Sequence, residues 1–261
     1  MSVSFDFGDS VVLVTGASGA LGSAVCETFA DAGATVAAAD VVAPDDEDAE
    51  LDAGERIDFY EGDFTDEADV ERVVSEIVDD HGGLDYLINV AGTWRGGTPV
   101  AETDADTFDF LFDVNLKTTF LAAKHALPHL RESSSEGGGG GDGAGDDGDG
   151  GAGDGDDARG AIVSVSARAS LEGGEGDAPY RASKAGVRLL TESIAEEEKG
   201  AVRANAVMPS VIDTPANREM MPDADHDAWV DPADIAETML ALCSDATSVT
   251  SGAAVPVYGE A

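Results

Sequence analysis

The sequence contains few cysteines and no long apolar run. Its two cysteines, Cys26 and Cys243, are too few for a disulfide framework or a metal cluster. No apolar stretch approaches the ~18 residues that a membrane span requires. The N-terminus also lacks the basic and apolar regions of a secretory signal. We therefore expect a soluble, cytoplasmic protein with no membrane partner.

Positive charge is scarce as well. The chain has 14 Lys and Arg against 54 Asp and Glu, a formal net charge of −40. Such a field repels the phosphates of nucleic acids, so we expect no nucleic-acid partner. Residues 136–158 consist only of Gly, Ala, Asp and Glu, and the rest of the chain still carries −32. This composition resembles that of halophilic proteins. Molar salt screens the repulsion between the surface charges of such proteins. An acidic protein at ordinary salt is the alternative.

Strand and helix patterns alternate along the chain. Apolar, β-branched runs predict strands at 11–15, 35–40, 57–60, 84–89, 161–165 and 202–207. Helical patterns lie at 20–32, 66–80, 104–130, 180–199 and 231–244. This alternation is typical of a single α/β domain, here residues 1–261, with a doubly wound parallel sheet and helices on both faces. Residues 136–158 have no side chain that could build a core, so we expect a flexible insertion there.

A glycine-rich turn follows the first predicted strand, with the sequence TGASGALG at residues 15–22. Glycines permit a tight turn and let backbone N–H groups approach a pyrophosphate at the N-terminus of the next helix. An ordinary strand-to-helix turn is the alternative. The strand before the turn and the helix after it favour a dinucleotide site.

Asp40 ends the second predicted strand, 18 residues after Gly22. A carboxylate at this place accepts hydrogen bonds from the adenosine ribose hydroxyls and repels a 2′-phosphate. The sequence therefore predicts NAD as the cofactor, with NADH preferred over NADPH. The alternative is that Asp40 is one more acid in a very acidic chain.

Tyr180 and Lys184 lie four residues apart in the segment YRASK. On a helix, this spacing places both side chains on one face, one turn apart. A nearby ammonium favours the phenolate, so Lys184 is expected to lower the pKa of Tyr180 for proton transfer at a carbonyl or alcohol oxygen. The same pair arises by chance in many helices, so it gains weight only beside the other motifs.

Together these motifs resemble the classical short-chain dehydrogenase/reductase family, and the resemblance covers nearly the whole chain. It extends to GDFTD around Asp63, NVAG from Asn89, FDVNLKTTF around Asn115 and RANAVMPSVIDT, which ends at Thr214. The family implies a Rossmann domain that binds NAD(P) and transfers hydride to or from a small carbonyl, alcohol or conjugated imine. It also implies a homodimer or homotetramer built on the helices that bear Asn115 and Tyr180.

The resemblance assigns roles to individual residues. Tyr180 is the expected proton donor, Lys184 the ligand of the nicotinamide ribose, and Asn115 the holder of a water in a proton relay. No metal site is expected, because the four histidines show no spacing that closes one with nearby acids. The residues expected to contact the cofactor extend from the glycine turn to the segment after the sixth strand: Gly16, Ser18, Gly19, Ala20, Leu21, Gly22, Asp40, Asp63, Phe64, Asn89, Ala91, Gly92, Tyr180, Lys184, Pro209, Ile212 and Thr214.

Two positions depart from the family pattern. Ala20 stands where the family usually has the middle glycine of the turn. Ala167 stands 13 residues before Tyr180, where the family has its catalytic serine. Ser166 is adjacent, but neighbouring side chains of a strand point to opposite faces. It replaces that serine only if the strand end bends or the register differs by one residue, and the sequence leaves this open.

The missing serine indicates a branch of the family that is similar to quinonoid dihydropteridine reductase. Residues 19–23, 90–97, 167–180 and 212–229 resemble the pattern of that enzyme, whereas Asn115 resembles the broader family. A quinonoid pterin accepts hydride readily and depends less on a hydroxyl donor. The sequence thus predicts an NAD-dependent oxidoreductase of this branch. Dihydropteridine reductase proper, a 3-oxoacyl thioester reductase and a non-catalytic NAD-binding sensor are the alternatives.

Overall fold

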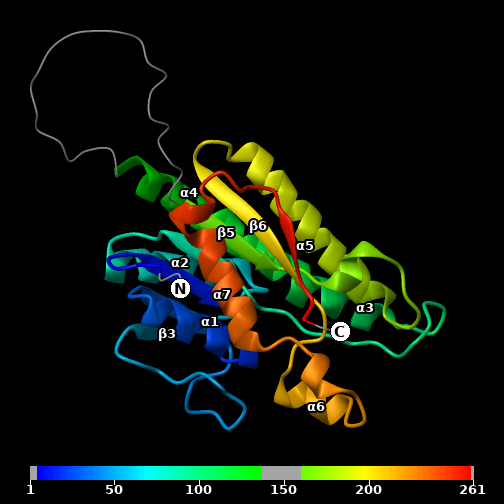
Figure 1. Ribbon diagram of the computed structural model, residues 1–261. Helices are drawn as coiled ribbons and strands as arrows, with labels where there is room; N and C mark the ends of the chain where they lie inside the picture. Colours follow the sequence, from blue (N-terminus) through cyan, green and yellow to red (C-terminus); the bar gives the residue numbers. More distant parts are fainter. Residues whose placement is uncertain (1–4, 137–159, 260–261) are drawn as a thin grey trace, which may run out of the picture.

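The computed structural model describes residues 5–136 and 160–259. Within these residues, seven parallel strands form one sheet in the order β3-β2-β1-β4-β5-β6-β7 (Figure 1). The strand order reverses between β1 and β4, which opens a crevice at the carboxyl ends of these two strands. The strands are β1 (Val11–Thr15), β2 (Thr35–Asp40), β3 (Ile57–Glu61), β4 (Tyr86–Asn89), β5 (Gly160–Val165), β6 (Val202–Pro209) and β7 (Ala254–Val257).

Helices cover both faces of the sheet, so the predicted doubly wound α/β fold is confirmed. Helices α1 and α7 pack together on one face, and α2, α4 and α5 cover the other (Figure 1). No helix in the two described stretches has both the length and the apolar character that a membrane crossing requires. The α-helices are α1 (Ala20–Asp31), α2 (Glu67–His81), α3 (Ala105–Phe112), α4 (Thr118–Glu136), α5 (Ala178–Glu197), α6 (Pro215–Met220) and α7 (Pro232–Cys243).

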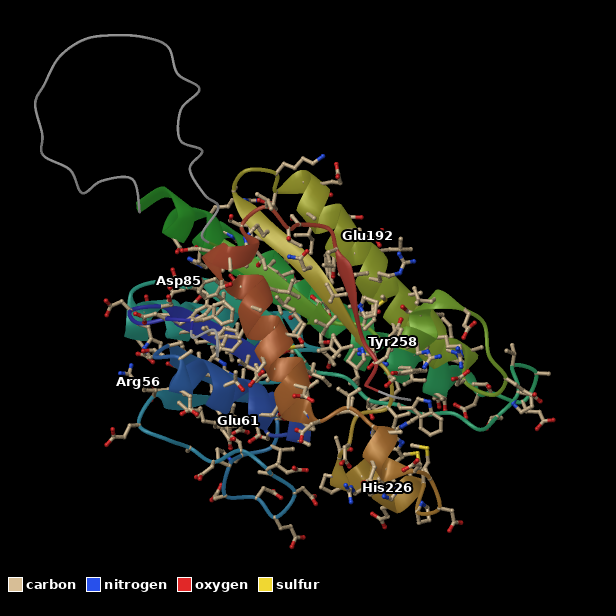
Figure 2. The ribbon with its side chains drawn as sticks, viewed as in Figure 1. Arg56, Glu61, Asp85, Glu192, His226 and Tyr258 are labelled. Atoms are coloured by element: carbon tan, nitrogen blue, oxygen red, sulfur yellow. The ribbon has the colours of Figure 1, made fainter. Side chains whose placement is uncertain are left out.

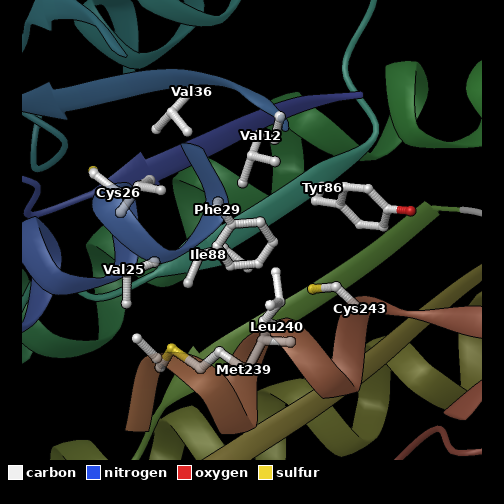
Figure 3. Close-up of a cluster of buried hydrophobic side chains, with 14 of the residues drawn as sticks. Val12, Val25, Cys26, Phe29, Val36, Tyr86, Ile88, Met239, Leu240 and Cys243 are labelled. Atoms are coloured by element: carbon white, nitrogen blue, oxygen red, sulfur yellow. The ribbon is translucent and has the colours of Figure 1, made fainter. Parts of the chain in front are cut away.

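The buried core has two layers because the sheet is covered on both sides. Side chains alternate along each strand, so Val12 and Val14 of β1 join the cluster beneath α1 and α7. Leu13, between them, joins the cluster beneath α2, α4 and α5. Figure 3 shows the first cluster, in which Phe29 of α1 and Met239 of α7 lie among the strand side chains. This packing holds the carboxyl ends of the central strands in fixed positions.

The helix predicted over residues 104–130 differs from the observed one. It consists of α3, a π-helical turn (Asp113–Lys117) and α4, which runs on to Glu136. Single π-helical turns inside α-helices often mark functional sites, and this one contains Asn115. The remainder of the predicted insertion, residues 137–158, lies outside the described residues. The single domain over residues 1–261 stays a prediction.

Two elements were missed in the sequence. The edge strand β7 is only four residues long and contains Pro256, which removes a backbone donor. Helix α6 spans six residues, which is too short for a helical period to emerge from the apolar pattern. Both elements lie at the carboxyl side of the sheet, where tertiary contacts decide their conformation.

Candidate active site

A cavity of about 1120 Å³ lies at the carboxyl ends of the strands. Open α/β sheets bind ligands at this edge, where the strand order reverses. Most of the predicted cofactor residues line it: Gly16, Gly19, Ala20, Leu21, Gly22, Asp40, Asp63, Phe64, Ala91, Gly92, Tyr180, Lys184, Pro209, Ile212 and Thr214. The structure thus brings residues from six separate segments of the chain to one surface.

The glycine turn is packed too tightly for side chains at two of its positions. Gly16 has a φ of +69°, and a Cβ there would lie 2.7 Å from the backbone nitrogen of Ala91. A Cβ on Gly22 would lie 2.0 Å from the carbonyl oxygen of Gly16. Gly19 is the N-cap of α1 and provides no side chain to cap the helix, whose first turn contains no acidic residue. The N-terminal N–H groups of this helix therefore suit an anionic group.

Asp40 is fixed beside this turn by its backbone neighbours. Its Oδ2 accepts a hydrogen bond from the backbone N–H of Ser18 at 3.0 Å, and its Oδ1 accepts one from Val42 at 3.1 Å. The Ser18 hydroxyl donates to the carbonyl oxygen of Val42 at 2.6 Å. Ser18 is buried behind the cavity surface, so it positions the carboxylate rather than lining the site.

Asp63 and Phe64 form the cavity wall beyond β3. The Asp63 Oδ1 accepts hydrogen bonds from the backbone N–H and the hydroxyl of Thr65, at 2.8 and 2.7 Å. Phe64 is buried and packs with the α2 side of the core. This corner therefore combines an apolar base with a carboxylate that Thr65 holds in place.

Asn115 lies behind the cavity wall and connects its parts. Its Oδ1 accepts a hydrogen bond from the backbone N–H of Thr93 at 2.7 Å. Its Nδ2 donates to the Thr93 carbonyl oxygen at 3.0 Å and to the Ser183 hydroxyl at 3.1 Å. A Cβ on Gly92 would lie 2.8 Å from both the Asn115 Oδ1 and the Lys184 Nζ. Only glycine at position 92 lets these two polar groups converge.

Asn89 also lies behind the wall, at the end of β4. It is buried, and its Nδ2 donates a hydrogen bond to the Ser164 hydroxyl at 3.2 Å. Among the described residues its Oδ1 has no hydrogen-bond partner. This placement suits a residue that ties β4 to β5, and it does not bring Asn89 to the predicted contact with the adenosine ribose.

Burial determines the protonation of the two central groups. It raises the pKa of Tyr180 to about 12, and the nearby carboxylate of Asp177 adds to this effect. Burial lowers the pKa of Lys184 to about 8. The Lys184 Nζ donates to the carbonyl oxygen of Val165 at 2.9 Å. The lowering of the Tyr180 pKa by Lys184 stays a prediction, because the net shift of that pKa is upward and desolvation of the phenol dominates it.

The hydroxyl of Ser166 is turned into the protein. It donates a hydrogen bond to the backbone carbonyl oxygen of Lys184 at 2.8 Å, and Ser166 is buried. Its backbone N–H donates to the Val207 carbonyl oxygen at 2.9 Å, which continues the β5–β6 pairing. Ala167, the next residue, places only a methyl group at the cavity. Ser166 also borders the cavity, but its hydroxyl already has a backbone acceptor, which favours Ala167 as the position of the missing serine.

The segment after β6 closes one side of the cavity. Thr214 is the N-cap of α6, and its hydroxyl accepts a hydrogen bond from the backbone N–H of Asn217 at 3.2 Å. The Asn217 Nδ2 donates to the Ile212 carbonyl oxygen at 2.8 Å. Met220 and Met221, at the end of α6, also line the cavity. The segment is thus internally braced and presents thioether side chains to the site.

Sequence reasoning missed three side chains that shape the site. Thr93 and Ser183 hold the Asn115 amide, and Arg168 lines the cavity directly after Ala167. Each stands next to a motif residue, but no local pattern indicates its role. Thr93 and Ser183 meet Asn115 across separations of 22 and 68 residues, which only the fold can reveal.

Comparisons with known proteins identify the family. A family model described as short chain dehydrogenase matches residues 10–139, and one described as enoyl-(acyl carrier protein) reductase matches residues 154–259. A cis-4-hydroxycyclohexanecarboxylate dehydrogenase of Sinomonas cyclohexanicum is 30% identical, over 97% of this chain and 96% of that protein. The chain belongs to the short-chain dehydrogenase/reductase family.

One further relative agrees with this assignment, and a solved structure shows the same fold. A 3-oxoacyl-[acyl-carrier-protein] reductase of Thermotoga maritima is 29% identical to this short-chain dehydrogenase/reductase, over 95% of the chain and 96% of that protein. The ligand-free aldohexose dehydrogenase of Thermoplasma acidophilum shares the fold, with a TM-score of 0.79 and 24% identity over 97% and 94% of the two chains. The family therefore makes this protein an oxidoreductase that uses a nicotinamide cofactor.

Proposed function

We propose that the protein transfers hydride between NAD(H) and a small carbonyl or alcohol. The observation that carries this proposal is that Tyr180 and Lys184 line the same cavity as the glycine turn and the Asp40 carboxylate. Two relatives support the choice of reaction, since their names describe the oxidation of a ring alcohol and the reduction of a 3-oxoacyl group.

The residues present fit a dinucleotide. A Cβ would meet the backbone of Ala91 at Gly16, the backbone of the turn itself at Gly22, and the Asn115 and Lys184 side chains at Gly92. The N-terminus of α1 suits the pyrophosphate, and Asp40 suits the ribose hydroxyls. When bound, nicotinamide supplies or accepts the hydride. Every proton and every orienting contact then comes from the side chains of this chain.

Tyr180 is the proton donor in the direction of reduction. A phenol whose pKa is about 12 is fully protonated at neutral pH, so it can give its proton to a carbonyl oxygen as negative charge develops there. Lys184 lies one helical turn away and carries the ammonium that stabilises the resulting phenolate. The Asn115 amide holds Thr93 and Ser183 in place around this pair.

Ala167 determines which substrates react quickly. The Ser166 hydroxyl donates to a backbone carbonyl, so Tyr180 polarises the substrate oxygen without a serine beside it. An electron-poor acceptor such as a quinonoid pterin needs a second donor less than a plain ketone does. This is the observation that favours the dihydropteridine reductase branch as the second candidate function.

A coupled assay tests the proposed reaction. NADH oxidation is followed with cyclic ketones, 3-oxoacyl thioesters and quinonoid dihydropterin, at low and at ~2 M KCl because of the acidic composition. We expect turnover of at least one carbonyl substrate. NADH binding without turnover of any substrate would instead support a non-catalytic NAD-binding sensor.

Cofactor preference is expected to depend on Asp40. NADH should outperform NADPH in wild type, and Asp40→Asn should raise the ratio of kcat/KM for NADPH to that for NADH by roughly tenfold or more. Removing ~1.4 kcal/mol of repulsion between the Asp40 carboxylate and the 2′-phosphate is enough for a tenfold change in this ratio. Asp46→Asn removes an equal charge from the loop after β2, outside the cavity, and should leave the ratio unchanged. A wild-type preference for NADPH would contradict the assignment of Asp40.

Ala167→Ser is expected to speed the reduction of plain ketones. A donor to a developing oxyanion contributes ~2.7–4 kcal/mol, so kcat should rise by a factor of up to about 10²–10³. Reduction of quinonoid dihydropterin should change little. Ser166→Ala is the matched control and should leave kcat nearly unchanged, because its hydroxyl donates to the backbone of Lys184. Loss of activity in Ser166→Ala with no gain in Ala167→Ser would overturn the assignment.

A homodimer or homotetramer is part of the proposal. Phe120 of α4 and Leu189 of α5 are large apolar side chains that are about half exposed. Exposed apolar groups on neighbouring helices suit contact with a second copy. Sedimentation analysis would give the oligomeric state directly.

A further inference from the structure

The loop that connects β5 to α5, residues 166–177, forms part of the cavity wall and leads directly to Tyr180 in the first turn of α5. It contains one short 3₁₀ turn (Arg168–Leu171), followed by glycines at positions 173, 174 and 176. Glycine gives a backbone its greatest conformational freedom, so this sequence does not by itself specify one shape. Contacts from outside the loop must hold the wall in place.

The side chain of Arg181 provides such contacts. Its Nε donates a hydrogen bond to the Asp177 carboxylate at 2.6 Å. Its Nη1 donates to the carbonyl oxygen of Glu172 at 3.1 Å and to that of Ala169 at 3.4 Å. The hydrogen bond to Asp177 raises the pKa of Arg181, so the guanidinium stays charged. Because a planar guanidinium has five donors, this one side chain joins the beginning, the middle and the end of the loop.

Gly174 makes room for the guanidinium. A Cβ at position 174 would lie 2.3 Å from both the Nε and the Cζ of Arg181. At the neighbouring Gly173, by contrast, no atom lies within 4 Å of a Cβ. Neither glycine has a φ in the left-handed region, so the backbone at both positions accepts an L side chain. The glycine at position 174 is therefore needed for the contact with Arg181 and not for a turn.

The loop after β4 is attached to the same wall. The backbone N–H groups of residues 97 and 98 both donate to the Gly176 carbonyl oxygen, at 2.8 and 3.2 Å. Trp94 lines the cavity and lies against Gly96. A Cβ at position 96 would lie 2.5 Å from a ring carbon of the indole and 3.2 Å from the Asp177 Cβ. The indole is thus held against the loop that the guanidinium joins together.

We propose that Arg181 is a positioning residue that holds residues 166–177 and the loop around Trp94 as one wall of the substrate site. This inference rests on the proposed hydride transfer and identifies what shapes the substrate side of that site. Tyr180 and Lys184 act at the reacting atoms, whereas Arg181 acts only through the wall. A substrate that meets an assembled wall does not have to order two loops when it binds. Arg181 should therefore affect substrate affinity more than the chemical step.

Arg181→Gln tests the proposal with cyclohexanone as the probe. If ~1–10% of the variant molecules keep the wall assembled, the KM for cyclohexanone rises by about 10- to 100-fold. We expect kcat and the Kd of NADH to change by less than about threefold, because the wall contributes to neither. Arg181→Lys keeps the charge beside Asp177 and should restore part of the KM. A fall of kcat at unchanged KM would overturn the proposal.

Arg188→Gln is the matched control for the loss of an arginine from α5. The Arg188 Nη1 donates to the carboxylate of Glu192, four residues further along the same helix, at 2.6 Å (Figure 2). The side chain of Arg188 is 25% exposed and that of Arg181 is 24% exposed. The Arg188 pair lies outside the cavity, so KM and kcat should keep their wild-type values. Equal increases of KM in both variants would contradict a specific role of Arg181.

Two adjacent glycines test the same contact without a change of charge. Gly174→Ala should displace the guanidinium and raise the KM for cyclohexanone, as Arg181→Gln does. Gly173→Ala should leave KM unchanged, because its Cβ has open space. Gly174→Ala combined with Arg181→Gln should raise KM no further than Arg181→Gln alone, since both substitutions remove one contact. Equal effects of the two glycine substitutions would contradict the proposal.

The fluorescence of Trp94 tests the wall without turnover. The chain has two tryptophans, so Trp229→Phe leaves Trp94 as the single one. In that background, acrylamide should quench Trp94 more strongly in Arg181→Gln and Gly174→Ala, because a loosened loop uncovers the indole. The two control variants should match the background protein. Unchanged quenching in Arg181→Gln and Gly174→Ala would overturn this inference and leave the proposed function intact. Stronger quenching without turnover of any carbonyl would support the wall and contradict the proposed reaction.

Discussion

Tyr180→Phe is expected to lower kcat for carbonyl reduction by a factor of about 10²–10⁴, the usual contribution of a positioned general acid. The substitution removes one hydroxyl and keeps the ring that lines the cavity, so NADH binding should be retained. Stopped-flow measurement of NADH oxidation and a fluorescence titration with NADH would separate the two effects. Retention of wild-type kcat would exclude Tyr180 as the proton donor.

Tyr60→Phe provides the matched control. The Tyr60 hydroxyl hydrogen-bonds to the Asp80 carboxylate at 3.0 Å and to the His81 Nε2 at 2.9 Å, outside the cavity. Its loss should leave kcat unchanged. A decrease of kcat in both variants would indicate a general effect on folding, which a thermal melt would detect.

The pH profile follows from the same assignment. Tyr180, with a pKa of about 12, keeps its proton throughout the accessible range, whereas Lys184 loses its proton as pH rises through about 8. The neutral amine no longer stabilises the phenolate, so the rate of reduction should fall above about pH 8. Below that pH, Lys184 is charged, so the protonation of Lys184 should cause no further change in the rate.

Gly22→Ala is expected to damage both the fold and the cofactor site. The new Cβ would lie 2.0 Å from the Gly16 carbonyl oxygen and 2.8 Å from the Ala17 Cα, so the backbone of the turn must move. Overpacking of this kind lowers the free energy of unfolding by ~1–3 kcal/mol or more. For a chain of this size, the Tm should drop by roughly 2–4 °C per kcal/mol. NADH binding should weaken in parallel.

Gly83→Ala is the control for a glycine substitution as such. No atom lies within 4 Å of a Cβ at that position, and its φ is outside the left-handed region. Alanine there should be neutral or stabilise the protein by up to ~1 kcal/mol, because it reduces the entropy of the unfolded chain. Equal melting temperatures for Gly22→Ala and wild type would show that the turn can relax without cost.

The sequence by itself determined six of the seven described strands and most of the residues that line the cavity. The apolar runs predicted β1 and β2 with the bounds that the structure shows. A strand that is buried on both faces is a continuous apolar run, and such a run is visible in the sequence. The glycine turn and Asp40 were found by their spacing from those strands. The helical period placed Tyr180 and Lys184 on one face, and the neighbouring motifs gave that pair its weight. These are local regularities, which a single chain displays without its fold.

Only the tertiary structure decided how the site works. The pKa of Tyr180 rises because segments distant in sequence bury the phenol, and the Ser166 hydroxyl is held by the backbone carbonyl oxygen of Lys184. Arg168 gains its place from Tyr258, 90 residues further along the chain, on the far side of β6. Burial, hydrogen-bond partners and ring contacts arise between separate elements, so no spacing within one element can encode them.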